Sequence, residues 1–442
     1  MRYVIIGGIA AGMSAAMEII RTDESAEVTV LERGEDYSYG QCGLPYVIGG
    51  VIPSVKDVIA RSVETFREKY HIDARINTEV TDINVKEQIV SGIQTERNEH
   101  FQISYDRLLI ALGSDPIVPD WNGIYLEGIH TLKTISDTKD IMTDMTDDMK
   151  HVTVVGGGYV GLEIAENFHR LGKKVTLIQR GEQVANIFDP DMAELIHEEA
   201  QKNGIELILG ESVVGFSGEK RVDTVITEKQ SYPTDFVLLG IGVRPNTAFL
   251  KDTGIYMNGQ GAIHVNAYME TSVENVYAAG NCATQYHRIK QVDDYIPLGT
   301  TANKQGRIAG ANMAGKSLTF KGIVGTAIMK FFDLTLGRTG LNEKEAQRYK
   351  IPYEVQTGKG SSHAGYYPGK EALNIKLLYH KQTKQLLGGQ IIGKKGVDKR
   401  IDVLSTALYN KMTVHQLLDL DLAYAPPYNG VWDPVQQMAR KM

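Results

Sequence analysis

Cysteine is almost absent from this chain of 442 residues, which contains only Cys42 and Cys282. Two thiols cannot build a disulfide framework, and no group of cysteine and histidine has the spacing of a zinc site. We therefore predict no metal site and a reducing compartment, the cytoplasm. The scarcity also makes these two thiols the first candidates for chemistry.

Positive charge and long apolar runs are also scarce. The 47 Lys and Arg residues are outnumbered by 54 Asp and Glu, which gives a net charge of −7 and lacks the basic excess typical of nucleic-acid-binding proteins. No run of apolar residues is long enough to span a membrane. The uncharged run 3–17 contains Gly7, Gly8 and Gly12 directly after Tyr3–Ile6, which is typical of a strand and tight turn rather than a signal peptide. We expect no nucleic-acid partner and no membrane association.

Glycine, by contrast, is plentiful, and it marks a duplicated unit of strand, turn and helix. In the second copy, an apolar strand over 152–155 runs into Gly156, Gly158 and Gly161, and a helix follows over 162–171. In this spacing the first glycine makes the turn, the second lets a pyrophosphate approach the backbone, and the third lets the helix pack on the strand. The pattern predicts a dinucleotide whose phosphates lie at the helix N-terminus.

The first copy keeps the outer glycines, Gly7 and Gly12, but has Ile9 at the middle position. Its second strand, over 28–31, ends in Glu32, twenty residues after Gly12, where a carboxylate can hold the ribose hydroxyls. This copy also predicts a dinucleotide site.

At the corresponding end of the second unit stand Gln179 and Arg180. Without a carboxylate there, a 2′-phosphate is not repelled, and Arg180 can pair with it. These two residues exclude neither NADH nor NADPH.

Further along the chain, the pattern changes near residue 325. Before it, apolar strands end at Gly113 and Gly240, and a helix is expected over 301–313. After it, short strands over 373–379 and 386–392 and two helical stretches from about 401 and 413 predict a separate α+β domain.

Together these residues resemble the two-dinucleotide flavoproteins of the pyridine nucleotide–disulfide oxidoreductase family, over essentially the whole chain. The resemblance implies an α/β fold with two Rossmann-like dinucleotide-binding domains and a C-terminal α+β dimerisation domain. It implies an FAD-binding domain over 1–113 and 243–322, an NAD(P)H-binding domain over 114–242 and a dimerisation domain over 323–442. It also implies a homodimer.

The same resemblance implies FAD, together with NADPH, NADH or both, as cofactors. The implied cofactor-binding residues are Gly7, Ile9, Ala10, Gly12, Glu32, Arg33, Ala111, Gly113, Asn281, Ala302, Gly156, Gly158, Tyr159, Val160, Gly161, Glu163, Gln179, Arg180 and Gly242. Tyr159 resembles the tyrosine that covers the flavin face, and Glu163 is expected to orient the nicotinamide, or else to be an exposed first-turn carboxylate. Asn281 stands where the family usually has Asp; it can still hydrogen-bond a ribityl hydroxyl but carries no charge.

The surroundings of Cys42 distinguish the branches of this family. Members that reduce glutathione or lipoamide carry a Cys-x4-Cys pair and a C-terminal His motif, and this chain has neither. The segment Ser38-Tyr39-Gly40-Gln41-Cys42 is instead similar to the Ser-Phe-x-Asn-Cys signature of coenzyme A-disulfide reductases, in the single-cysteine branch. NADH oxidases and peroxidases of that branch carry a histidine where Ala10 stands here.

The resemblance implies that NAD(P)H reduces coenzyme A disulfide to two thiols through FAD and a mixed disulfide between Cys42 and coenzyme A. A thiolate needs a lowered pKa, and we expect a helix beginning near Gly43-Leu44-Pro45 to provide it. Tyr424 is the candidate proton donor and Tyr366 its partner, both acting across the dimer interface; Tyr367 and Tyr428 are the alternative tyrosines. Cys282 is expected to be packed and inert.

Coenzyme A carries several phosphate charges, so its site needs basic or amide groups. The candidate substrate-binding residues are Arg21, Ser38, Gln41, Arg61, Asn303 and Arg307. Taken singly, each arginine is also compatible with a solvated surface charge. Three other functions stay open: an NADH oxidase or peroxidase, a persulfide reductase, and a flavin-bound redox sensor.

Overall fold

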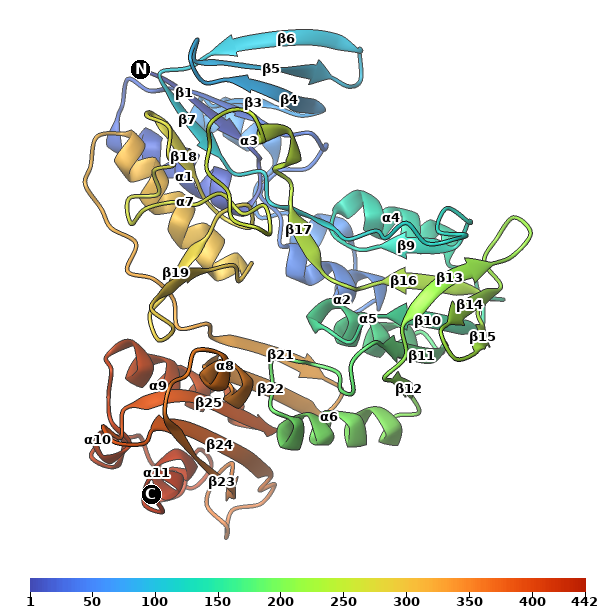
Figure 1. The fold of residues 1–442 in the computed structure, drawn as a ribbon, viewed down its shortest axis with the longest axis vertical. Helices are drawn as coiled ribbons and strands as arrows, with labels where there is room; N and C mark the ends of the chain where they lie inside the picture. Colours follow the sequence, from blue (N-terminus) through green and yellow to red (C-terminus); the bar gives the residue numbers. More distant parts are fainter.

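The computed structural model describes residues 1–442, and its first sheet joins segments that are far apart in the sequence (Figure 1). Five parallel strands lie in the order β18-β7-β1-β2-β3. Their bounds are β1 (Arg2–Ile6), β2 (Glu27–Leu31), β3 (Asp73–Arg75), β7 (Arg107–Ile110) and β18 (Val276–Ala278). The strand from residue 276 therefore completes a sheet begun at residue 2.

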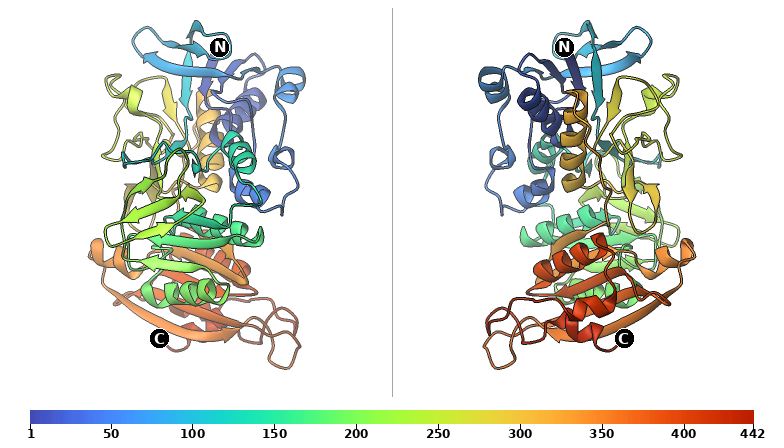
Figure 2. Two further views of the ribbon diagram at one scale, coloured as in Figure 1. Left: turned by 90° about the vertical axis from the view of Figure 1, so that its right-hand side faces the viewer. Right: turned by 90° about the vertical axis from the view of Figure 1, so that its left-hand side faces the viewer.

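Two helices pack against each other beside this sheet, α1 (Ala10–Thr22) and α7 (Gly299–Met313) (Figure 2). Their backbones touch because α7 carries glycines at the contact. A Cβ on Gly306 would lie 2.1 Å from the Ala11 carbonyl oxygen, and one on Gly310 would lie 2.4 Å from that of Ala15. Only glycine permits this approach.

The second sheet repeats the arrangement, with parallel strands in the order β12-β11-β10-β16-β9. Its strands are β9 (Ile129–Thr131), β10 (His151–Val155), β11 (Lys174–Gln179), β12 (Glu206–Leu209) and β16 (Phe236–Leu239), with helices α4 (Ile135–Asp144), α5 (Tyr159–Arg170) and α6 (Pro190–Lys202). In both units the third glycine supports the helix-to-strand turn. A Cβ on Gly12 would lie 1.8 Å from the Gly7 carbonyl oxygen, and a Cβ on Gly161 would lie 1.9 Å from the Gly156 carbonyl oxygen.

The C-terminal sheet is antiparallel, with the order β21-β22-β25-β24-β23. It contains β21 (Ala327–Phe331), β22 (Leu334–Gly340), β23 (Tyr353–Ser361), β24 (Ala372–His380) and β25 (Leu386–Gly393), with helices α8 (Glu343–Arg348), α9 (Val397–Tyr409), α10 (Val414–Leu418) and α11 (Pro434–Ala439). The predicted strands and helical stretches are confirmed here, and the predicted fold class with them.

The sequence analysis missed the short elements. These are α3 (Val63–Tyr70), β4 (Thr78–Asn84), β5 (Ile89–Gln94), β6 (Glu99–Ser104), β8 (Ser114–Pro116), β13 (Val213–Ser217), β14 (Thr224–Thr227), β15 (Ser231–Pro233), β17 (Val243–Pro245), β19 (Gln285–His287) and β20 (Val292–Asp294). The helix expected near Gly43-Leu44-Pro45 is present as α2 (Leu44–Ile48). The antiparallel pair β8 and β17 lies where the chain enters and leaves the second unit. The exact domain bounds remain a prediction. No helix is both long and apolar enough to cross a bilayer.

Candidate active site

Cys42 lies on a segment of the first unit that contacts the second unit. It occupies a single 3-10 turn, Gln41–Gly43, that runs into α2, with Pro45 in the first turn of that helix. Helix α2 packs against α4 and α5 of the second unit (Figure 1). The Cys42 side chain is accessible to solvent, so a substrate can reach its sulfur.

The electrostatic surroundings of Cys42 differ from the expectation. Burial of the thiol by neighbouring atoms and the nearby Glu163 carboxylate raise its pKa, and Lys133 opposes them only in part. The prediction that a helix N-terminus lowers the pKa of the Cys42 thiol is wrong for the protein groups alone. Helix α2 has only five residues, and a carboxylate lies close to the thiol. The thiol is therefore held protonated until another charge or dipole acts on it.

Glu163 is a further titratable group beside Cys42. It projects from α5, and the Tyr46 hydroxyl of α2 donates a hydrogen bond to its carboxylate at 3.4 Å. Burial raises the pKa of Glu163 to about 7, and the neighbouring Glu166 adds to this rise, so its charge changes near neutral pH. The reading of Glu163 as a freely exposed first-turn carboxylate does not fit this half-buried position.

Both Gly-rich loops fit a dinucleotide pyrophosphate. The two helices that follow them, α1 and α5, begin without a side-chain cap, as do α6, α7 and α9. The first-turn amides of α1 and α5 are therefore free to bind an anion. At Gly158 no atom lies within 4 Å of the Cβ position, which leaves room for a phosphate at the middle of the motif.

The ends of the second strands differ between the two units. Glu32 accepts hydrogen bonds from the amides of Gly8 at 2.7 Å and Gly34 at 3.0 Å. Gln179 takes the equivalent place and accepts one from Gly157 at 2.9 Å. Next to Glu32, Arg33 forms an ion pair with Asp115. The corresponding Arg180 is exposed and has no carboxylate within ion-pair distance.

The other predicted cofactor residues lie around these loops. Ala111 and Gly113 follow β7, Asn281 follows β18, and Ala302 lies on α7 against Gly280. Tyr159 and Val160 form the first turn of α5, and burial raises the pKa of Tyr159 to about 12. Gly242 lies between β16 and β17 with a φ of 120°, a conformation that favours glycine.

A cavity of about 530 Å³ opens beside Ile9 and Ala10 of the first loop. Its lining includes five of the six predicted substrate residues, which are Arg21, Ser38, Arg61, Asn303 and Arg307. The sixth, Gln41, donates instead to the Lys133 carbonyl oxygen at 3.2 Å. No carboxylate lines the cavity, so the site is positively charged in a protein of net charge −7.

Lys304 is a further cation in the lining of this cavity, and it was not among the predicted substrate residues. It precedes Arg307 by three residues on α7, a spacing that puts both on one helix face. That spacing is the signal that identifies it.

The two candidate tyrosines hydrogen-bond to each other, their hydroxyl oxygens 2.8 Å apart. Tyr366 lies on the β23–β24 loop and Tyr424 between α10 and α11. Both are exposed, Tyr366 by 75% and Tyr424 by 45%. Neither tyrosine lines the cavity, whose lining includes Ser38, Tyr39 and Gly40 but not Cys42 itself.

Cys282 is packed, as expected. Its side chain is fully buried, with the sulfur 3.4 Å from the Ile110 carbonyl oxygen. Burial raises the pKa of its thiol to about 11, so Cys282 is unreactive at neutral pH.

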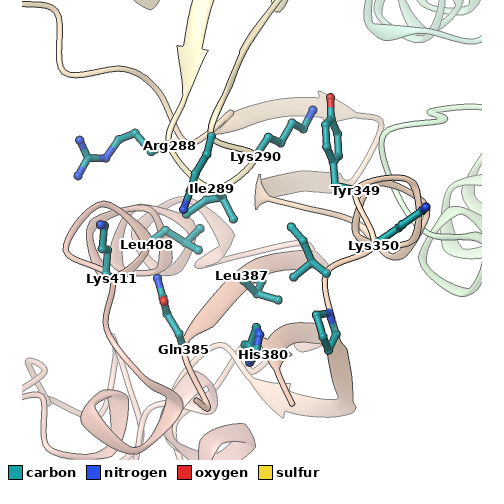
Figure 3. Close-up of a pocket in the computed structure, with 13 residues that line it drawn as sticks. Arg288, Ile289, Lys290, Tyr349, Lys350, His380, Gln385, Leu387, Leu408 and Lys411 are labelled. Carbon is teal, nitrogen blue, oxygen red and sulfur yellow. The ribbon is translucent and has the colours of Figure 1, made fainter. Parts of the chain in front are cut away.

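A second cavity, of about 380 Å³, lies between the β19–β20 hairpin and the C-terminal sheet (Figure 3). Its lining is partly apolar, with Ile289, Leu387 and Leu408. Lys290 also borders it, but its ammonium is held by Asp294 at 2.7 Å and Glu345 at 2.6 Å. None of the predicted site residues lines this cavity.

Comparison with known proteins agrees with this geometry. A family model described as pyridine nucleotide-disulphide oxidoreductase matches residues 1–306, and the model of the dimerisation domain of that family matches residues 326–434. The chain belongs to the pyridine nucleotide-disulphide oxidoreductase family. It is an NAD(P)H-dependent flavoprotein oxidoreductase, and membership implies FAD and a nicotinamide dinucleotide.

Relatives within this family carry several names. The chain is 39% identical to an NAD(P)H sulfur oxidoreductase (CoA-dependent) of Pyrococcus abyssi, covering 99% of this chain and 97% of that protein. It is 34% identical to a coenzyme A disulfide reductase of Staphylococcus haemolyticus, covering 100% and 99%. It is also 34% identical to an NADH oxidase of Methanocaldococcus jannaschii, covering 99% and 98%.

Two solved structures share the fold over the whole chain. One is reduced CoADR-RHD of Bacillus anthracis, with a TM-score of 0.97 and 36% identity, covering 100% of this chain and 79% of that one. The other is a NAD-dependent persulfide reductase of A. fulgidus, with a TM-score of 0.97 and 35% identity, covering 100% and 82%. These matches agree on the family, whereas the names of its members specify different substrates.

Proposed function

We propose that this enzyme reduces coenzyme A disulfide to two coenzyme A thiols at the expense of NAD(P)H. The observation that carries the proposal is the cavity lined by Ser38, Tyr39 and Gly40, where Arg61, Lys304 and Arg307 gather with Arg21, whose guanidinium also pairs with Glu18 at 3.3 Å. A substrate with several phosphates matches four cations, and a small uncharged oxidant such as oxygen needs none. Relatives named for coenzyme A support the same substrate.

The reaction proceeds through a mixed disulfide between Cys42 and coenzyme A. FAD, when bound, takes a hydride from NAD(P)H and supplies two electrons to sulfur. These electrons break the mixed disulfide, which releases one coenzyme A thiol and leaves the Cys42 thiolate. The thiolate attacks coenzyme A disulfide, a new mixed disulfide forms, and the second coenzyme A leaves as a thiolate that takes up a proton. Two protons end on the product thiols. One is the hydrogen of the hydride after its two electrons have passed to sulfur, and the other reaches the leaving thiolate from a protein acid that solvent then reprotonates.

The Tyr366–Tyr424 pair is the proposed source of that last proton. Hydrogen bonding to Tyr424 raises the pKa of Tyr366, and either hydroxyl can be the donor of the pair. When Tyr366 donates to Tyr424, the O–H of Tyr424 is free to donate to the leaving sulfur. Because the pair lies apart from the cavity in one chain, this role needs a homodimer in which one protomer supplies the tyrosines and its partner the thiol. The dimerisation domain supports such an assembly.

Gln179 and Arg180 favour NADPH as a reductant within the same scheme. Gln179 accepts a hydrogen bond from its glycine loop as Glu32 does in the first unit, but it carries no charge. Arg180 is exposed and can pair with a 2′-phosphate. The two free thiols, Cys42 and Cys282, suit the reducing conditions of the cytoplasm, where we place the enzyme.

Mass spectrometry of the purified enzyme before and after addition of NADPH tests the proposal. The expected result is an adduct of the mass of coenzyme A on Cys42 that NADPH releases, with none on the Cys42→Ser variant. Cys282 serves as the internal control, since it is buried and carries no adduct. An unmodified or sulfenylated Cys42, combined with rapid oxygen or peroxide turnover, overturns the proposal in favour of an oxidase or peroxidase.

Polysulfide is the second candidate substrate, because the same exposed thiol can attack a sulfur chain. The persulfide reductase of the same fold supports this alternative. Comparing kcat/KM for coenzyme A disulfide and for a persulfide of coenzyme A distinguishes the two. A kcat/KM at least tenfold higher for the persulfide would identify the persulfide, rather than the disulfide, as the physiological substrate.

A further inference from the structure

The side chain of Arg400 is buried between the two loops that carry the tyrosines. It lies on α9, is 1% exposed and forms an ion pair with Asp433, Nε to carboxylate oxygen 3.0 Å. Its Nη1 donates to the Gly396 carbonyl oxygen at 2.8 Å. A Cβ at Gly396 would lie 2.3 Å from that nitrogen, so glycine there makes room for the guanidinium.

The remaining donor of Arg400, Nη2, reaches both tyrosine loops. It donates to the Ser362 carbonyl oxygen at 3.0 Å, four residues before Tyr366. It also donates to the Asn429 side-chain oxygen at 2.9 Å. The amide nitrogen of Asn429 in turn donates to the Ala423 carbonyl oxygen at 3.2 Å, one residue before Tyr424.

A direct backbone bond closes this network. The Ala364 amide donates to the Pro426 carbonyl oxygen at 3.2 Å and joins the two loops. The tyrosine hydroxyls meet on the outside, while Arg400 and Asn429 hold the loops from the inside.

A buried ion pair is a weak device for stability, because apolar residues of similar volume often stabilise a core as well or better. Arg400 places its remaining donors on the backbone of the β23–β24 loop and on Asn429, rather than on the sheet. The rigid guanidinium fork fixes the direction of each bond. The arrangement therefore defines the relative position of two exposed loops.

We propose that Arg400, acting through Asn429, is a positioning residue that holds Tyr366 and Tyr424 in the geometry needed for proton transfer to the leaving thiolate. The inference rests on the proposed function. Apart from this network, the two exposed hydroxyls share only one hydrogen bond with each other, and proton transfer is sensitive to displacements of about 1 Å.

A double-mutant cycle on the FAD-loaded dimer tests the proposal with Asn429→Ala, Tyr424→Phe and the combined variant. Asn429→Ala leaves the ion pair of Arg400 with Asp433 in place and removes the side-chain amide that joins Arg400 Nη2 to the Ala423 carbonyl oxygen, together with its bond from the Gly430 amide. The matched control is Asn342→Ala, another buried asparagine of the same domain, which caps α8 and contacts neither tyrosine loop. The readouts are kcat on coenzyme A disulfide and the rate at which NADPH reduces the bound flavin.

We expect Tyr424→Phe to lower kcat about 100-fold and Asn429→Ala at least about tenfold, with flavin reduction unchanged in both. The combined variant should be no slower than Tyr424→Phe, because a positioning residue has no effect once the group it positions is gone. Arg400→Lys keeps the charge opposite Asp433 but loses the fork, and it should reproduce Asn429→Ala.

The outcomes distinguish a failure of the positioning role from a failure of the proton-donor role. If Tyr424→Phe is slow but the combined variant is slower by the product of the single effects, Asn429 acts independently of Tyr424 and the inference is wrong. The same conclusion follows if Asn429→Ala slows turnover no more than Asn342→Ala. If Tyr424→Phe turns over at the wild-type rate, the proton-donor role itself fails, and the positioning role fails with it.

Discussion

Replacing Glu163 by glutamine should stabilise the protein in a manner that depends on pH. The pKa of this carboxylic acid rises from 4.5 to about 7 on folding because of burial. Between these values the native state keeps a proton that the unfolded state has released, so stability falls as pH rises from 4.5 to 7 and stays low above 7. At about 1.4 kcal/mol per pKa unit, the ionised carboxylate costs about 3 kcal/mol at pH 8 and less than about 1 kcal/mol at pH 5.

Glutamine carries no charge at either pH, so the Glu163→Gln variant should gain about 3 kcal/mol over the wild type at pH 8 and under about 1 kcal/mol at pH 5. Guanidinium unfolding followed by circular dichroism at the two pH values measures this difference. Glu198→Gln, an exposed carboxylate on α6, is the matched control. An equal gain for Glu163→Gln at both pH values would refute the argument from burial.

The same variant should make Cys42 more reactive. The Glu163 carboxylate contributes to the raised pKa of the Cys42 thiol, so its removal lowers that pKa and increases the thiolate fraction at pH 7. Iodoacetamide reports Cys42 alone because Cys282 is fully buried. Unchanged alkylation of Glu163→Gln across pH 6 to 9 would show that the two groups are not coupled.

Three further predictions concern binding and packing. Arg307→Ala should raise KM for coenzyme A disulfide about tenfold and weaken its dependence on ionic strength, with little change in KM for NADPH; steady-state kinetics at two salt concentrations measure both. Gln179→Glu should shift the kcat/KM ratio of NADPH to NADH toward NADH about tenfold or more, and an unchanged ratio would remove this position from coenzyme selection. Gly306→Val should prevent close packing of α7 on α1 and lower the melting temperature and FAD content together, whereas Gly259→Val, in open space and without a positive φ, serves as its comparison.

Sequence reasoning located the elements that depend on local patterns. Glycine spacing and apolar strands identified both dinucleotide loops, because a turn against a helix N-terminus has a strict backbone requirement at Gly12 and Gly161. Most residues of the cation-lined cavity were also predicted, since a substrate with several phosphate charges needs basic or amide groups near the reactive thiol. Lys304 was missed because a lysine beside Asn303 looks like any exposed helix residue.

The pKa of Cys42 could not be read from the sequence. It depends on Glu163, 121 positions further along the chain, and that contact exists only because α2 packs on α5. The antiparallel strands 78–104 were missed because their polar faces weaken the alternation that identifies a strand. Long-range packing, rather than local propensity, decides both features.

The insertion of one unit within the other has a consequence for synthesis of the chain on the ribosome. All strands of the second sheet lie between residues 129 and 239, whereas the first sheet and its helix pair need β18 and α7, which end at residues 278 and 313. Domains fold as their chains emerge. The unit that is encoded first is therefore completed second, and the first sheet stays open until the whole second unit has been made.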